Sequence, residues 1–225
     1  MDGQAPPQAP SIDRRLEILD AAQACFARAG FHRTTMQDIA SEAGMSVGNL
    51  YRYFASKDAV IAGLSERDRA SAAADFGALE HADDFLAAFR RIGEKYFREE
   101  PRERAIVCLE IWAEATRNPE VAAHCAAFEC EMLGRMIEAF GRAQARGAIA
   151  TTLPPETMAR MVMTVADGLY LRRALDPRFD VEGEVSRALA LIGAILRGAV
   201  HAAPASASPS PEQTHADASH SEVAP

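Results

Sequence analysis

Four residues that can bind a metal ion lie close together in the sequence: His124, Cys125, Glu129 and Cys130. Positions five residues apart are offset by about 140° around a helix, and the paired CxxC or HxxxH spacing of a zinc site is missing. The sequence also has no Walker loop, GxGxxG or HExxH motif, and its Cys and His residues form no recognisable nucleophile arrangement. We therefore expect no catalytic residue, no metal site and no cofactor.

The composition is that of an ordinary globular protein, with 48% hydrophobic and 25% charged residues among 225. No run of about 18 apolar residues occurs, and no basic segment leads into an apolar one near the N-terminus, so neither a membrane span nor a secretory signal is predicted. The four cysteines are too sparse for a disulfide framework. We expect reduced thiols in a cytoplasmic protein.

The distribution of charge matters more than the formal net charge of −8, which by itself would disfavour binding to nucleic acid. Residues 1–60 hold six Lys/Arg and seven Asp/Glu (net −1), whereas residues 61–200 hold 18 and 22 (net −4). The last 25 residues add three acids and no base (net −3). The acidic charge is thus concentrated away from the N-terminal part.

Apolar residues recur with a period of 3.6 between two Pro-rich ends, and no long alternating strand pattern occurs. The pattern predicts an all-α chain with disordered tails at 1–10 and 201–225. Short helices are expected after the N-cap residues Ser11, Thr35, Ser46 and Ser56, with Leu16 inward in the first and the third extending through Phe54. Longer helices are expected at 83–99, 102–115, 119–146, 155–174 and 181–200, the last two as an antiparallel hairpin.

Two of the short helices are joined at Gly44-Met45-Ser46 and match a helix-turn-helix, whose second helix can lie in a DNA major groove. Alanines at 40 and 43 are small where the helices cross closely, and Gly44 permits the sharp turn. Apolar residues would lock the two helices at a fixed angle: Ile39, Val47 and Leu50.

The residues around this turn resemble the TetR family of bacterial transcriptional regulators: TTMQDIA at 34–40, AGMSVGNLYRYF at 43–54 and SKD at 56–58. Upstream, ILDAA at 18–22 and FARAGF at 26–31 are similar to the family's first helix. WAEA at 112–115, RNPE at 117–120 and DGL at 167–169 are more loosely similar to its regulatory domain. The resemblance implies a helix-turn-helix DNA-binding domain over 11–56 and a larger helical domain over 57–200 that dimerises and binds an inducer.

The resemblance also implies roles for single residues. Gln37, Gly48 and Asn49 fall where the family reads base edges, and Asn and Gln side chains pair well with adenine. Many members have a polar residue where Val47 stands, so here an apolar side chain is offered to a thymine methyl group. Tyrosine hydroxyl and lysine ammonium groups fall where the family holds phosphates, although a core aromatic and a solvated charge are alternatives for Tyr51 and Lys57. The complete set implied is Thr35, Gln37, Ser46, Val47, Gly48, Asn49, Tyr51, Arg52, Tyr53 and Lys57.

Large apolar side chains gather in the segment where the family's inducer cavity lies. Methionine and aromatic side chains suit a small hydrophobic or amphipathic inducer, while the competing interpretation is ordinary core packing. The candidate lining residues are Phe89, Tyr96, Trp112, Phe128, Met132, Met136 and Met161.

The last two predicted helices carry apolar stripes, and the resemblance implies that they form a four-helix bundle with a second copy. The residues expected at this interface are Met158, Met161 or Val162, Val165, Leu169, Val185, Leu189, Ile192, Ile195 and Leu196.

These expectations describe a homodimeric repressor that binds a near-palindromic double-stranded operator and leaves it when an inducer binds. One alternative is a DNA-anchored module of the same fold whose large domain binds another protein. Another is a helical enzyme, for which the sequence lacks a catalytic arrangement.

Overall fold

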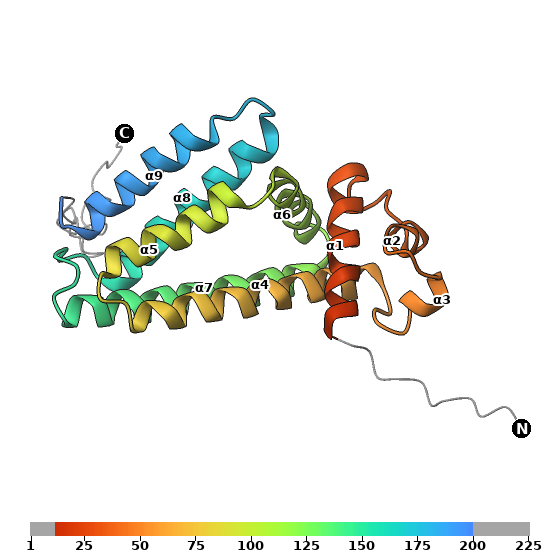
Figure 1. The fold of residues 1–225 in the computed structure, drawn as a ribbon, viewed down its shortest axis with the longest axis horizontal. Helices are drawn as coiled ribbons and strands as arrows, with labels where there is room; N and C mark the ends of the chain where they lie inside the picture. The colour runs from red at the N-terminus through yellow and green to blue at the C-terminus, as the bar shows by residue number, and fades with distance from the viewer. Residues whose placement is uncertain (1–11, 200–225) are drawn as a thin grey trace, which may run out of the picture.

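A computed structural model describes residues 12–199 of the chain (Figure 1). Over this range the chain forms nine α-helices and one short π-helix and no strand, so the predicted all-α fold is confirmed. None of these helices is both long and apolar enough to cross a membrane. The expected tails at 1–10 and 201–225, the cap at Ser11 and the helix end at position 200 lie outside the described residues.

The first three helices form a small unit at one end of the molecule (Figure 1). They are α1 (Ile12–Ala29), α2 (Met36–Glu42) and α3 (Val47–Leu50). One stripe of α1 is buried against α2, α3 and the start of the following helix, and comprises Ile18, Leu19, Ala22, Cys25 and Phe26. The expectation that Leu16 faces inward is wrong, because it lies outside this stripe and is 40% exposed.

The third helix is shorter than predicted. It ends at Leu50 and does not continue through Phe54, because the amides of Arg52 and Tyr53 bond to carbonyls only three residues back and tighten the chain into a turn. This turn brings Phe54 into the core, where it is 2% exposed.

The remaining helices form the larger domain: α4 (Lys57–Glu80), α5 (Phe85–Glu94), π-helix η1 (Lys95–Glu99), α6 (Arg102–Ala115), α7 (Pro119–Ala145), α8 (Pro155–Leu175) and α9 (Val181–Leu196). The long helices α4 and α7 lie side by side, α5 and α8 pack against this pair, and α9 packs against α5 and α8, while α6 lies beside the small domain (Figure 1). The helix predicted at 83–99 is instead α5 followed by η1, which shifts the direction of the side chains that follow.

The core of the larger domain is aromatic at one end. The ring centres of Phe85 and Phe89 are 6.0 Å apart, and those of Phe89 and Phe140 are 5.3 Å apart. Most side chains expected at the dimer interface belong to the intrachain core instead, since α8 and α9 pack onto the rest of the domain. Those that are buried in this way are Met158, Val162, Leu169, Val185, Leu189, Ile192, Ile195 and Leu196.

Candidate nucleic-acid interface

The predicted helix-turn-helix is held by two local caps. The Thr35 hydroxyl accepts a hydrogen bond from the Asp38 amide at 3.1 Å, and the Asp38 carboxylate accepts one from the Thr35 amide at 2.8 Å, so the predicted N-cap at Thr35 is confirmed and forms a capping box with Asp38. The Asp38 carboxylate also accepts a hydrogen bond from the Thr35 hydroxyl at 2.7 Å, and this bond together with the one from the Thr35 amide lowers the pKa of Asp38 below its ordinary value. Ser46 caps α3 in the same way, accepting from the Asn49 amide at 3.2 Å.

The turn between α2 and α3 needs the left-handed backbone conformation that glycine adopts without strain. Gly44 has a φ of +62°, and the amide of Met45 bonds to the carbonyl of Ala40 at 2.9 Å. Ile39, Ala40 and Leu50 are fully buried beneath the turn. The angle between the two helices is therefore fixed by packing and not by the turn alone.

Residues 44–48 also spell GxSxG, a pattern that the nucleophile serine of α/β hydrolases shares. In those enzymes the serine follows a strand, whereas here it lies between two helices and the described residues contain no strand. The Ser46 oxygen serves as a helix cap. The pattern is accordingly part of the helix-turn-helix and gives no nucleophile.

The structure places all ten residues of the candidate DNA-contacting set on or beside this motif. Gly48, Tyr51 and Arg52 are exposed on and just after α3, and Tyr51 is 52% exposed, which excludes a core role for its ring. The other exposed members are Thr35, Gln37 and Ser46, and the half-buried members are Val47, Asn49, Tyr53 and Lys57.

Two members of the set also have structural roles. Tyr53 packs against the core of the small domain, while its carbonyl accepts a hydrogen bond from Arg15 at 3.1 Å. The Lys57 ammonium donates to the carbonyl of Phe31 at 2.7 Å and lies 4.5 Å from the centre of the Phe31 ring. The Lys57 ammonium therefore already has a hydrogen-bond acceptor and an aromatic partner within the chain.

The basic side chains of the small domain differ in how firmly they are held. Arg28 pairs with Glu42 at 2.9 Å, and Arg33 donates to the carbonyl of Ala29 at 2.9 Å. By contrast, Arg52 makes no hydrogen bond, ion pair or ring contact with any part of residues 12–199. Its guanidinium remains available for a phosphate or a base edge.

In the larger domain, most of the proposed pocket residues are part of the core. Phe89 is 7% exposed and stacks with other rings, and Met132, Met136 and Met161 pack against the same cluster. The remaining three are half-buried: Tyr96, Trp112 and Phe128. Phe89 is therefore a core residue, whereas Tyr96, Trp112 and Phe128 each keep part of their surface accessible to solvent.

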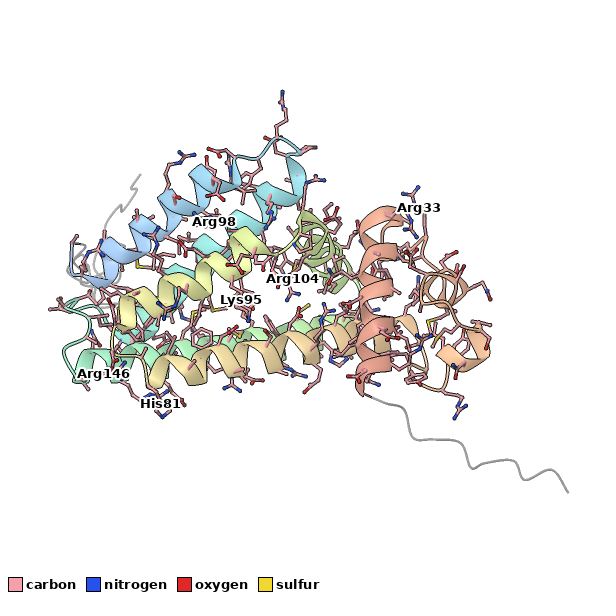
Figure 2. All side chains as sticks on the ribbon, in the orientation of Figure 1. Arg33, His81, Lys95, Arg98, Arg104 and Arg146 are labelled. Carbon is pink, nitrogen blue, oxygen red and sulfur yellow. The ribbon has the colours of Figure 1, made fainter. Side chains whose placement is uncertain are left out.

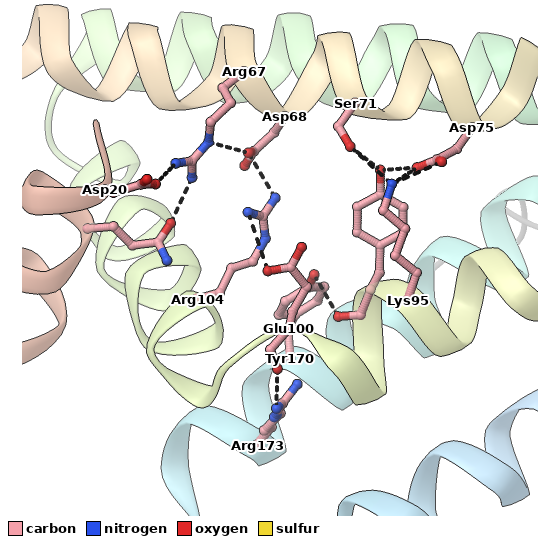
Figure 3. A network of polar contacts seen from close by, with 12 residues as sticks. Asp20, Arg67, Asp68, Ser71, Asp75, Lys95, Glu100, Arg104, Tyr170 and Arg173 are labelled. Atoms are coloured by element: carbon pink, nitrogen blue, oxygen red, sulfur yellow. Dashed lines mark hydrogen bonds and ion pairs between the residues drawn. The ribbon is translucent and has the colours of Figure 1, made fainter. Parts of the chain in front are cut away.

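Sequence analysis missed a polar network inside this domain (Figures 2 and 3). The Lys95 ammonium lies 2.7 Å from the Asp75 carboxylate, and the Tyr96 hydroxyl donates to the same carboxylate at 2.7 Å. Burial and the neighbouring Asp75 carboxylate raise the pKa of Tyr96 to about 12, so its phenol stays protonated at neutral pH. Lys95 and Tyr96 are adjacent residues of the π-helix η1, and both reach the Asp75 carboxylate.

A second part of the network joins α4 to α6 and α8 (Figure 3). The Arg104 guanidinium lies 2.8 Å from the Asp68 carboxylate, and burial raises the pKa of the neighbouring Tyr170 hydroxyl. Burial likewise raises the pKa of the Cys108 thiol to about 12. Asp68 and Asp75 are seven residues apart and so share one face of α4, which was the only signal in the sequence.

The region considered for a metal site does not assemble one. Among residues 12–199, no three His, Cys, Asp or Glu side chains are close enough to hold a common ion. The four cysteines are free thiols, as expected.

Comparison with known proteins extends the resemblance over most of the chain. Residues 18–64 match the family model described as bacterial regulatory proteins of the tetR family. Residues 85–201, over half of the chain, match the model described as the C-terminal part of BetI-type transcriptional repressors. The match thus includes both the helix-turn-helix and the larger domain.

Individual relatives agree with this assignment. The HTH-type transcriptional regulator UidR of Escherichia coli K12 is 29% identical over 155 residues, which are 69% of this chain and 79% of that protein. The structure of Salmonella enterica GusR has a TM-score of 0.68 at 26% identity and covers 85% of this chain and 100% of its own. A complex of SmeT with triclosan has a TM-score of 0.66 at 25% identity, covering 80% and 90%, respectively. The chain therefore belongs to the TetR family of bacterial transcriptional regulators, which are not enzymes.

Proposed function

We propose that this chain is a cytoplasmic, homodimeric repressor that occupies a near-palindromic operator through α3 and leaves it when a small molecule binds the larger domain. The observation that carries the proposal is the outward display of Gly48 on α3 and of Tyr51 and Arg52 in the turn just after it, while Leu50 on the other face of α3 is fully buried. A rigid helix with a polar outer face can enter a major groove without unfolding.

The proposed DNA contacts fall into two groups, those to base edges and those to phosphates. Gln37 and Asn49 carry amides that can pair with adenine, and Val47 offers methyl groups to thymine. Tyr51 and other phosphate contacts fix the position of the domain on the duplex and carry little sequence information, whereas Arg52 can serve either purpose. The remaining members of the set are Thr35, Ser46, Gly48, Tyr53 and Lys57.

The polar network inside the larger domain supports an amphipathic ligand. Tyr96 supplies a protonated phenol, Arg104 supplies a cation that is paired with Asp68, and Trp112 and Phe128 are half-buried aromatic side chains of the same domain. A molecule that binds the DNA-incompetent form about a hundredfold better than the competent form shifts the equilibrium by roughly 2.7 kcal/mol, enough to weaken operator binding considerably. The complex of the related SmeT with triclosan is consistent with a small-molecule ligand.

The dimer is proposed to form through the outer faces of α8 and α9, as the family resemblance implies. Large apolar side chains remain exposed there: Leu171 at 41%, Leu175 at 65% and Leu191 at 50%. Exposed leucines on two adjacent helices are typical of an interface. These three replace the buried residues that the sequence pattern had suggested.

The DNA-binding part is tested by selecting bound duplexes from random DNA and mapping the preferred site by hydroxyl-radical footprinting. We expect two protected half-sites whose centres are about one helical turn apart or more. Asn49→Ala and Gln37→Ala should relax preference at defined base pairs, whereas Ser41→Ala, on an exposed position of α2, should not. Selection of no preferred sequence would refute operator binding.

The regulatory part is tested separately, by sedimentation and by thermal shift. Leu175→Glu should convert the dimer to a monomer, whereas Glu103→Ala, at an exposed position of α6, should leave it intact. In a panel of small amphipathic compounds, a compound that raises Tm should also release DNA.

A protein partner in place of the small molecule is the second candidate. A groove of about 310 Å³ between α5 and α9 favours it, since Leu86, Phe89 and Ile192 contribute apolar surface there. If no compound shifts Tm and Leu86→Asp abolishes regulation while DNA binding persists, the partner is a protein.

A further inference from the structure

The turn that follows α1, residues 30–32, is hydrogen-bonded to the larger domain on two sides. On one side, the Lys57 ammonium at the start of α4 donates to the carbonyl of Phe31 at 2.7 Å. On the other, the Phe31 amide donates to Oε2 of Glu110 on α6 at 2.9 Å. Gly30 adopts a φ of +79°, and a Cβ placed on it would lie 3.0 Å from Glu110 Oε2, so α6 approaches the backbone closely.

A second acidic residue of α6 holds the next residue of the turn. The carboxylate of Glu114 is 2.9 Å from Nε2 of His32 and accepts a hydrogen bond from Nε of Arg117 at 2.9 Å. Glu114 is only 5% exposed. Asn118 donates to Glu114 at 3.3 Å and to Asp58 of α4 at 3.1 Å, which ties the start of α7 to the start of α4.

Apolar contacts lie beside these polar ones. Val107 of α6 and Val121 of α7 are 4% and 0% exposed, and both belong to the core cluster of the small domain. The small domain is therefore seated on α6 and α7 and is not merely linked to the larger domain through α4.

We propose that Glu110 and Glu114 are positioning residues that fix the DNA-binding domain on α6, and that the turn at 30–32 carries movement between α6 and the recognition helix. A displacement of α6 must either move this turn or separate the buried carboxylate of Glu114 from His32 and Glu110 from the Phe31 amide, which is costly. The coupling rests on the proposed DNA-binding function, whereas the role of Glu110 and Glu114 in holding the turn does not.

Coupling between two sites is reciprocal, so DNA binding at α3 must also change the position or environment of α6. Trp112 lies between the two glutamates and is the sole tryptophan of the chain. Its fluorescence therefore reports on α6 without an added label and without knowledge of the inducer.

The experiment compares the full-length chain with Glu110→Ala and Glu114→Ala, and with Glu103→Ala as the matched control on an exposed position of α6. A selected duplex with a fluorescent end is titrated, and its anisotropy reports binding while Trp112 emission reports α6. At saturation with DNA, we expect an emission change that each glutamate variant reduces at least twofold and the control retains. An unchanged response in both glutamate variants, or no response in the unaltered chain, would overturn the coupling.

A second readout needs no DNA and so separates this inference from the proposed function. Hydrogen–deuterium exchange is measured in the peptide that contains the Phe31 amide. Glu110→Ala should accelerate its exchange by about tenfold, since one hydrogen bond is lost, and Glu110→Gln, which keeps an acceptor oxygen, should restore protection. Equal exchange in the unaltered chain and in Glu110→Ala would overturn the claim that Glu110 holds the turn. Failure of DNA binding together with altered exchange would count against the proposed function alone.

Discussion

The ammonium of Lys57 lies 2.7 Å from the carbonyl oxygen of Phe31 and joins the start of α4 to the turn after α1. Lys57 is also a candidate phosphate contact. Because one ammonium has three donors, the two roles are compatible, but removing the charge affects the free chain as well as the complex.

Lys57→Met and Arg52→Met are therefore expected to behave differently. Lys57→Met should lower the free energy of unfolding by about 1.5–3 kcal/mol, through loss of a hydrogen bond from a charged donor, and also weaken DNA binding. Arg52→Met should leave stability unchanged and lower the slope of log affinity against log salt by about one. Urea unfolding and anisotropy at several salt concentrations measure both quantities. Equal stability losses in the two variants would contradict this distinction.

Gly48→Ala should separate stability from function. A Cβ at this position would meet no atom of the chain within 4 Å, and alanine in a helix is favoured over glycine by about 0.5–1 kcal/mol. We expect a higher Tm together with DNA binding weakened about tenfold, because the added methyl group lies between α3 and the duplex. Unchanged affinity would show that the backbone at Gly48 does not approach DNA closely.

The capping box should make stability depend on pH. Because hydrogen bonds from Thr35 lower the pKa of Asp38 in the folded state, its contribution is present above the ordinary pKa and is lost as pH falls through the lowered value. Asp38→Ala should thus destabilise the chain at pH 7 and have a smaller effect towards pH 2. Urea unfolding across this range tests the trend, with Ser41→Ala as a control whose effect does not vary with pH.

The thiols should differ in reactivity at pH 8. Cys130 is exposed, whereas burial raises the pKa of Cys108 to about 12 and keeps it protonated. Iodoacetamide should modify exposed Cys130 faster than half-buried Cys108 in the folded chain, and both at similar rates once denaturant is added, as followed by mass spectrometry of the peptides. Modification of both at similar rates in the folded chain would contradict the raised pKa of Cys108.

The sequence predicted those parts of the fold that depend on local chemistry. Gly44 has a positive φ, as the predicted sharp turn requires, and the caps at Thr35, Ser46 and Ser56 are present, because each depends on residues a few positions away. The ranges of α6 and α7 agree with prediction to within one residue for the same reason.

Features that depend on distant partners were not predictable from periodicity. The polar face of α4 at Asp68 and Asp75 gives no apolar stripe, and its partners Arg104 and Lys95 come from α6 and η1. An apolar stripe likewise does not tell whether its partner is the same chain or a second copy, as the burial of Leu189 and the exposure of Leu191 show.

The central claim is sequence-specific DNA binding through α3, and fluorescence anisotropy tests it most directly. The chain is titrated against duplex DNA from its own upstream region and against a shuffled duplex at several salt concentrations. We predict tight binding to the first duplex alone, lost in a Tyr51→Phe, Arg52→Met double variant that remains folded. Weak and equal binding to both duplexes, followed by no enrichment from random DNA, would contradict the account.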